Sequence, residues 1–274
     1  MKTYTNAPLP FQGQKRRFAK QIAEMAKQQK KGSIFVDLFG GSGLVSHIVK
    51  YARPECRVVY NDYDNYQERL KNLHRTNAML HSLRPILENI PHKMRIDEPT
   101  RSKVIAEVER WNKSGYVDWI TLSSNLHFTM NYSRNFEEFR KETLYNKLRQ
   151  TDYIVDGYLE NVEVVSLDYR ELFERFKLVP DVVFIVDPPY LSTDCSTYNN
   201  ADYWRLSDYL DVLKCLQETN FVYFTSSRSS VLELIEWISH NKFNENPFNN
   251  ARIFRMHVGG IALNYDDIMI VKAA

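Results

Sequence analysis

The chain has 274 residues, of which 43% are hydrophobic and 26% are charged, and its formal net charge is +2. These values are typical of a globular protein with one α/β domain that carries an insertion, or with two small domains. No apolar run approaches the roughly 20 residues that a membrane-spanning helix needs, and the N-terminus leads into no apolar signal core, so we expect a cytoplasmic protein.

The first predicted elements form a βαβ unit. Residues 33–38 are a short apolar run that ends at a glycine cluster, which predicts a buried strand. Residues 44–49 continue as a helix, and residues 57–62 form a second strand. Such a unit implies parallel strands joined by a right-handed crossover.

A long segment without strand signals follows, from about residue 65 to residue 157. It has helical periodicity, and residues 66–150 contain 15 Lys/Arg against 10 Asp/Glu, a balance of +5. A basic segment of this kind is either a lobe that faces phosphates or an ordinary solvated surface. Strands resume at residues 162–166, 182–186, 221–225 and 267–271. The sequence therefore predicts an α/β fold, a doubly wound Rossmann-like sheet interrupted by a mainly helical insertion.

Two features after the first strands are suited to an adenosine-containing ligand. Residues 37–43, DLFGGSG, place glycines where backbone N–H groups can approach a ligand closely. The stretch is not GxGxxG, so a generic glycine turn is the alternative. Asp62, at the tip of the second strand, can accept hydrogen bonds from ribose hydroxyls or can cap a helix. NAD and S-adenosylmethionine both contain adenosine, so these features do not separate them.

Asp-Pro-Pro-Tyr follows the strand at residues 182–186. Two prolines make a rigid, extended turn that fixes the directions of the Asp187 carboxylate and the Pro188 carbonyl. Both groups are acceptors suited to an NH₂ group, and Tyr190 offers a ring on which a planar base can stack. The alternative is a purely structural turn.

Near the N-terminus, residues 10–15 read PFQGQK. They form either a lid whose Lys15 neutralises a carboxylate or an ordinary N-terminal arm. In chain order, PFQGQK, DLFGGSG and DPPY resemble the motifs of the Dam-like, D12 class DNA adenine-N6 methyltransferases. The lid motif comes first in that family, and the catalytic motif follows the recognition insertion. The resemblance covers the chain outside the insertion.

The resemblance implies a methyltransferase domain that binds S-adenosylmethionine, made of residues 1–65 and 158–274, and a target-recognition insertion at residues 66–157. The implied catalytic residues are Asp187, Pro188, Pro189 and Tyr190. The implied cofactor contacts are Phe11, Lys15, Asp37, Phe39, Gly41, Gly43, Asp62 and Asp168. Helix capping is the alternative role of Asp168.

The insertion departs from the family pattern at residues 127–135, HFTMNYSRN. This stretch keeps aromatics, asparagines and an arginine but lacks the glycine of the family's aromatic-Asn-Gly sequence, so the target sequence cannot be borrowed. Arg134, with Asn131 and Asn135, is the predicted DNA contact, since arginine can bond guanine in bidentate fashion. A surface or phosphate-contacting arginine is the alternative. The polar residues 191–202 are expected to order over a flipped base, or to be a plain surface loop.

The predicted reaction is site-specific methyl transfer from S-adenosylmethionine to N6 of adenine in double-stranded DNA, with base flipping and with S-adenosylhomocysteine as product. N4-cytosine and RNA amines are alternative substrates. An NAD-dependent oxidoreductase would lack a His/Tyr/Lys set and leave DPPY unexplained, and an inactive DNA-binding protein is a further alternative. Three scattered cysteines, without a CxxC pair, predict free thiols and no metal. We expect a prokaryotic or phage-encoded protein with no membrane partner, and a separate restriction endonuclease is a candidate partner.

Overall fold

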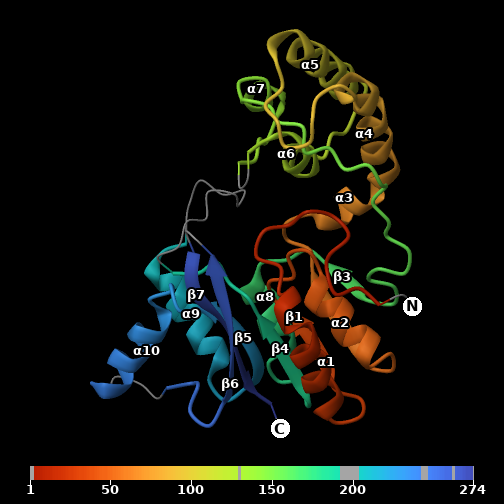
Figure 1. Ribbon diagram of the computed structural model, residues 1–274. Helices are drawn as coiled ribbons and strands as arrows, with labels where there is room; N and C mark the ends of the chain where they lie inside the picture. The colour runs from red at the N-terminus through yellow and green to blue at the C-terminus, as the bar shows by residue number, and fades with distance from the viewer. Residues whose placement is uncertain (1–2, 129–130, 192–203, 242–245, 261–262, 274) are drawn as a thin grey trace. The chain divides into compact units, whose positions relative to one another are not determined.

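The computed structural model describes residues 3–128, 131–191, 204–241, 246–260 and 263–273 (Figure 1). The chain forms two compact units. Unit 1 comprises residues 1–6, 13–64 and 157–274, and unit 2 comprises residues 7–12 and 65–156.

Unit 1 is built around a seven-stranded sheet with helices on both faces (Figure 1). Its helical elements are η1 Arg16–Phe18, α1 Ala19–Gln28, α2 Leu44–Ala52, α8 Tyr169–Phe176, α9 Leu206–Leu216 and α10 Val231–His240. Its strands are β1 Ile34–Asp37, β2 Arg57–Asn61, β3 Glu163–Val165, β4 Val182–Val186, β5 Asn220–Ser226, β6 Arg252–Gly260 and β7 Leu263–Lys272. The order is β3-β2-β1-β4-β5-β7-β6, which is a Rossmann-like doubly wound arrangement extended at one edge by a hairpin.

The first five strands in this order are parallel, whereas β7 runs antiparallel to β5 and β6 antiparallel to β7. All five residues of β4, Val-Val-Phe-Ile-Val, are buried, as a central parallel strand requires. Buried residues of α8, α9 and α10 pack on one face of the sheet, against Phe184 and Tyr223. Each such side chain contributes about 1.5–3 kcal/mol by burial. This core holds the ends of the parallel strands at one edge.

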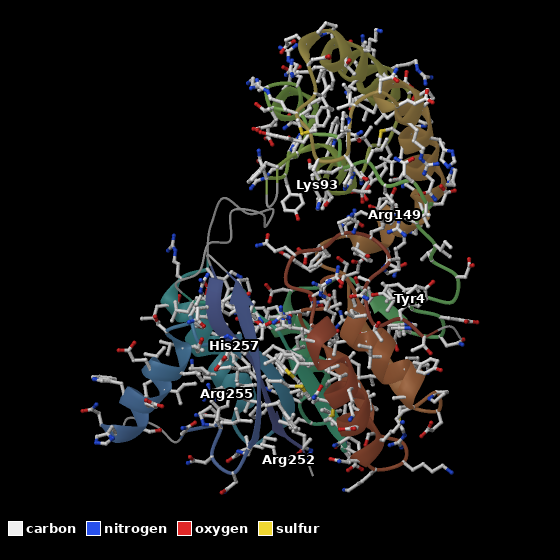
Figure 2. All side chains as sticks on the ribbon, viewed as in Figure 1. Tyr4, Lys93, Arg149, Arg252, Arg255 and His257 are labelled. Atoms are coloured by element: carbon white, nitrogen blue, oxygen red, sulfur yellow. The ribbon has the colours of Figure 1, made fainter. Side chains whose placement is uncertain are left out.

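The predicted strands are all present, and the sheet contains one strand that the sequence did not predict, β6. This strand lies at the edge and pairs only with β7. Its sequence is interrupted by the exposed residues Arg252, Arg255 and His257, so it contains no hydrophobic run from which a strand could be predicted (Figure 2). A strand at a sheet edge tolerates charged residues because one side of its backbone faces no neighbouring strand.

Unit 2 is mainly helical, as the sequence predicted for the insertion. Its helices are α3 Tyr66–Lys71, α4 Leu73–Leu87, α5 Glu98–Lys113, α6 Trp119–Leu126 and α7 Phe136–Phe139. Helix α5 begins after Asp97, whose carboxylate accepts from the Thr100 N–H at 2.9 Å. None of the described helices is long and apolar enough to span a membrane.

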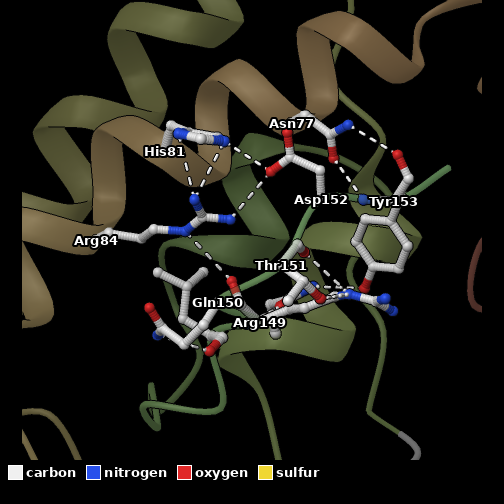
Figure 3. Close-up of polar contacts among 10 residues, drawn as sticks. Asn77, His81, Arg84, Arg149, Gln150, Thr151, Asp152 and Tyr153 are labelled. Atoms are coloured by element: carbon white, nitrogen blue, oxygen red, sulfur yellow. Dashed lines mark hydrogen bonds and ion pairs between the residues drawn. The ribbon is translucent and has the colours of Figure 1, made fainter.

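The C-terminal stretch of unit 2 is fastened to α4 by polar contacts (Figure 3). The Asn77 amide donates to the Tyr153 carbonyl and accepts from the Tyr153 N–H, both at 3.0 Å. His81 Nε2 lies 2.7 Å from the Asp152 carboxylate, and Arg84 lies 3.3 Å from the same oxygen. These contacts join α4, near the start of the insertion, to the residues at its end.

Residues 7–12 pack with unit 2, although the sequence grouped them with the residues 1–65. The Tyr66 hydroxyl accepts from the Leu9 N–H at 3.0 Å and donates to the Leu9 carbonyl at 3.2 Å. Arg69 donates to the Pro10 carbonyl at 2.8 Å and forms a buried ion pair with Asp118 at 3.1 Å. Contacts this distant in sequence are set by tertiary structure, so no local pattern could have shown them.

Candidate functional site

The loop after β1 turns sharply into α2. Gly43 precedes the helix with φ of +74°, and its N–H donates to the Gly40 carbonyl at 2.7 Å. Gly41 also has a positive φ, of +49°. A Cβ on Gly43 would lie 2.7 Å from Leu159, and one on Gly40 would overlap the Tyr60 ring. The loop therefore depends on glycine both for its backbone angles and for its close packing.

Asp37 ends β1 and is fully buried. The Ser46 hydroxyl donates to Asp37 Oδ2 at 2.7 Å, while Oδ1 has no hydrogen-bond partner among the described residues. Burial raises the pKa of Asp37 to about 7, the Ser46 hydrogen bond opposes this, and the charge of Asp187 adds to it. The backbone N–H of Phe39 also interacts with this carboxyl, and Oδ1, which no donor of the described residues meets in hydrogen-bond geometry, is suited to accept from a ligand.

Asp62 follows β2 and is buried. The Tyr60 hydroxyl lies 2.8 Å from Asp62 Oδ1 and 2.7 Å from the Gly41 carbonyl. Burial, with the charge of Asp62, raises the pKa of Tyr60, so the hydroxyl keeps its proton. Tyr60 therefore ties Asp62 to the glycine loop.

Asn61 joins the ends of two strands. Its amide donates to the Leu38 carbonyl at 3.0 Å and to the Leu167 carbonyl at 2.9 Å, and its oxygen accepts from the Leu167 N–H at 2.9 Å. Asp168, the next residue, is exposed and accepts from the Arg170 N–H at 2.8 Å, so it is the N-cap of α8. The capping role that the sequence left open is thus observed, and a cofactor contact of Asp168 stays a prediction.

Asp187 follows β4 and is largely buried. It forms an ion pair with the Lys15 ammonium and accepts a hydrogen bond from Tyr190. Burial raises the pKa of Asp187, while Lys15 and Tyr190 oppose the shift. Pro188 is buried and Pro189 is half-buried, and the rings of both residues restrict the backbone of this segment.

The two predicted aromatic cofactor contacts lie in different units. Phe39 is in unit 1, with its ring centroid 4.9 Å from Tyr169 and 5.5 Å from Trp204. Phe11 is in unit 2, where its ring packs edge-on against Tyr66 at 5.8 Å. Contacts of either ring with a cofactor stay predictions.

The three predicted DNA contacts take part in two separate sets of polar contacts in unit 2. The Asn131 amide donates to Glu142 at 2.7 Å, and the Arg134 backbone N–H donates to Glu138 at 2.8 Å. Asn135 caps α7 by accepting from the Glu138 N–H at 2.9 Å. The Arg134 side chain is exposed, and its contact with DNA stays a prediction.

Parallel strands bring several predicted residues to one edge of the sheet, since Asp37 ends β1, Asp62 follows β2 and Asp187 follows β4. The sequence did not single out four residues that hold this edge: Gly40, Ser46, Tyr60 and Asn61. Two of them carry a signal: Tyr60 shares a strand face with Asp62, and Ser46 lies one helical turn after Gly43.

The described residues contain no group of three or more His, Cys, Asp or Glu that could hold a metal ion. Cys56 and Cys215 are buried free thiols. Cys195 and residues 192–202 of the predicted loop lie outside the described residues.

Comparison with known proteins gives a family for the chain. The sequence profile of the D12 class N6 adenine-specific DNA methyltransferases matches residues 11–246. A protein of Haemophilus influenzae described as a "Putative methyltransferase" is 33% identical over 285 residues, which cover 99% of this chain and 93% of that protein.

Among solved structures, precorrin-8w decarboxylase of Methanobacterium thermoautotrophicum overlaps with a TM-score of 0.36 at 12% identity, over 98% of this chain and 95% of its own. The precorrin-6y C5,15-methyltransferase of Geobacter metallireducens has a TM-score of 0.36 at 7% identity, over 100% of both chains. These scores are too low to inform the function of this chain. The sequence matches are sufficient, and they show that the chain belongs to the family of D12 class N6 adenine-specific DNA methyltransferases.

Proposed function

We propose that the protein transfers a methyl group from S-adenosylmethionine to N6 of adenine in double-stranded DNA and releases S-adenosylhomocysteine. The observation that carries the proposal is the position of Asp187, a largely buried carboxylate on a rigid Pro-Pro turn after β4. Tyr190 lies beside it, and Asp37 and Asp62 follow two other parallel strands of the same sheet.

The residues after β1 and β2 fit the cofactor. Oδ1 of Asp37 is a buried acceptor that would take a hydrogen bond from the cofactor's ammonium group. Asp62, held by Tyr60, would accept from ribose hydroxyls. Gly40 and Gly43 keep the loop free of Cβ atoms, so its backbone can approach the ligand. When bound, S-adenosylmethionine supplies an electrophilic methyl group.

The residues after β4 would activate the amine. An exocyclic amine is a weak nucleophile because its lone pair is delocalised into the ring. The Asp187 carboxylate and the Pro188 carbonyl would accept its two hydrogens, which favours a tetrahedral nitrogen. These two acceptors would hold the nitrogen in line for the methyl group that the bound cofactor would supply, and the excess proton would leave to solvent. Holding both reactants in this alignment supplies much of the acceleration.

The target adenine has to leave the duplex before its amine can reach Asp187. Unstacking costs a few kcal/mol, and stacking on the Tyr190 ring would offset part of that cost. Tyr190 therefore has a proposed role in capturing the flipped base.

Unit 2 presents a surface suited to DNA, which supports its proposed role in target recognition. Lys93 and Arg95 are exposed, and Arg95 pairs with Tyr145 in a short antiparallel bridge. Phe128, at 67% exposed, lies 5.8 Å from the Tyr145 ring. Cationic groups beside exposed aromatic rings suit phosphates and bases respectively.

The test is single-turnover methyl transfer from labelled cofactor to a mixed DNA pool, with the methylated base identified by mass spectrometry. We expect N6-methyladenine in the wild-type reaction. Asp187→Asn should lower the rate by about 10²–10³, because an amide replaces a charged acceptor. Cofactor affinity should stay within a few-fold of wild type.

Asp181→Asn is the matched control, because Asp181 lies before β4, at the opposite end of the strand from Asp187. Its φ of +53° is one that asparagine tolerates. An Asp187→Asn protein that methylates at the wild-type rate would contradict the mechanism. N4-methylcytosine, or activity only on RNA, would contradict the proposed substrate.

A further inference from the structure

Lys15 occupies an unusual position for a residue expected to hold the cofactor. Its ammonium forms an ion pair with Asp187 and donates to the Gly13 carbonyl at 2.6 Å. It also lies 5.3 Å from the centroid of the Tyr190 ring and 5.6 Å from that of Phe224. Only 10% of the Lys15 side chain is exposed. The ammonium is thus placed on the carboxylate that has to receive the target amine.

A second carboxylate, Asp267, also interacts with this ammonium, because the charge of Lys15, together with that of Arg17, lowers the pKa of Asp267 against the effect of burial. Lys15 lies over Phe224 of β5, the strand between β4 and β7 in the sheet. Phe224 pairs with Met269 of β7, and Asp267 stands two residues before Met269, so Asp267 faces the same side of the sheet. Asp187 follows β4 on the opposite side of β5. Lys15 therefore interacts with two carboxylates, with Asp187 through an ion pair and with Asp267 through its charge.

We propose that Lys15 is a positioning residue for methyl transfer, which holds Asp187 in place before the target binds and moves to Asp267 when the amine takes its place. This inference rests on the proposed function. It departs from the expectation that Lys15 holds the cofactor.

The physical reason is a conflict of charge. The attacking nitrogen becomes positive as it gains the methyl group, so an ammonium on the same carboxylate would repel it and compete for its acceptors. Before the target arrives, the same ammonium is favourable, because a buried carboxylate without a partner is costly. The lysine side chain is a flexible four-carbon stem with a compact charge, which can exchange one carboxylate for another.

Within the part of the chain that the structure describes, the charged and titratable groups that interact with Asp187 are Lys15, Tyr190, Asp37, Asp267 and Tyr223. Burial raises the pKa of Asp187, and Lys15 is the largest of the influences that lower it. Removing Lys15 therefore raises the pKa of Asp187 further. A smaller fraction of the protein then has an ionised carboxylate at a given pH, so the acid limb of the rate profile moves to higher pH.

The first experiment compares Lys15→Met and Lys15→Arg with wild type. Cofactor affinity is measured by calorimetry. Methyl transfer is followed from about pH 5 to about pH 8 at DNA concentrations well below saturation, so that the profile reports the protein before the target binds. For Lys15→Met we expect cofactor affinity within about threefold of wild type and an acid limb displaced upward by about one pH unit or more. Lys15→Arg should move the acid limb most of the way back to its wild-type pH, because arginine keeps the positive charge.

A tenfold or greater loss of cofactor affinity in Lys15→Met, with the acid limb unmoved, would overturn the proposal and return Lys15 to the cofactor site. The calorimetric comparison needs no catalysis. A wild-type protein that methylates no DNA would therefore remove the proposed function, while the affinity of Lys15→Met would still show whether Lys15 holds the cofactor.

The second experiment tests Asp267. Asp267→Asn removes the alternative partner of Lys15, so Lys15 should compete more strongly with the target amine. We expect the KM for DNA to rise by about threefold to tenfold, with cofactor affinity unchanged. Asp266→Asn is the control, because Asp266 lies on the opposite face, with its carboxylate 3.2 Å from His257 Nδ1. Equal KM values for Asp267→Asn and Asp266→Asn would overturn the role of Asp267.

Discussion

At the scale of single residues, the candidate site contains buried carboxyl groups, Asp37 and Asp187, whose ionised form burial disfavours. Asp37 is the clearest case, since burial raises its pKa to about 7. The folded protein therefore binds a proton more tightly at this position than the unfolded chain does. The resulting stabilisation is present at low pH and is lost as pH rises from the unfolded value of 3.8 toward about 7. At neutral pH the buried Asp37 therefore makes the folded protein less stable than at low pH, which fits its proposed role in binding a ligand.

This shift gives the cofactor affinity a predicted pH dependence. A cationic ammonium binds the ionised form of Asp37, so affinity should rise as pH increases toward about 7 and then level off. Asp37→Asn should weaken binding and remove this dependence. Calorimetric titrations at several pH values measure it. A wild-type affinity that is flat across the same range would contradict the assignment of Asp37.

Asp62 and Tyr60 give a graded prediction. Hydrogen bonds to a charged group contribute about 1.5–3 kcal/mol, so Asp62→Ala should weaken cofactor binding at least tenfold. Tyr60→Phe leaves the carboxylate but removes the hydroxyl that orients it, so a smaller loss is expected. Tyr51→Phe, at a side chain that is 43% exposed, is the control. Calorimetry that found Asp62→Ala unchanged would remove Asp62 from the site.

At the scale of elements, Asp168 is a residue assigned to the site that also caps a helix, α8. Asp168 accepts from the Arg170 N–H, and a cap of this kind contributes about 0.5–2 kcal/mol. Asp168→Asn should keep the cap and the stability, whereas Asp168→Ala should lose both. Thermal unfolding measures the stability, and calorimetry measures the affinity. If Asp168→Asn lowers cofactor affinity tenfold at unchanged stability, the carboxylate serves the cofactor as well.

The strands differ in how far the sequence could predict them. The strands β1, β2 and β4 are buried on both faces of the sheet, so their residues form short apolar runs. Such runs can be recognised in the sequence alone. The edge strand β6 forms by pairing with β7. Its polar residues Arg252, Arg255 and His257 interrupt any apolar run, so the sequence alone did not predict it. Its pairing depends on a neighbour, which composition does not show.

At the scale of the whole molecule, the proposed role of unit 2 in DNA binding predicts how DNA affinity depends on salt concentration. Lys93, Arg95 and Lys147 belong to unit 2, and changing all three to Gln should weaken DNA binding. The salt slope should fall by up to about 0.9 for each phosphate that the variant no longer neutralises. Fluorescence anisotropy at several salt concentrations measures both quantities. Changing Lys20, Lys27 and Lys31 of unit 1 to Gln is the control for net charge. Equal slopes for the two triple variants would contradict the proposed role of unit 2.

The sequence by itself determined six of the seven strands, the mainly helical insertion, the glycine loop and the Asp-Pro-Pro-Tyr segment, because each depends on residues adjacent in the chain. Only the tertiary structure decided which partners these residues have. Asp187 forms an ion pair with Lys15. Hydrogen bonds of Tyr66 and Arg69 place residues 7–12 in unit 2. Parallel pairing brings strand ends together from distant parts of the chain, so it selects contacts that no local pattern encodes.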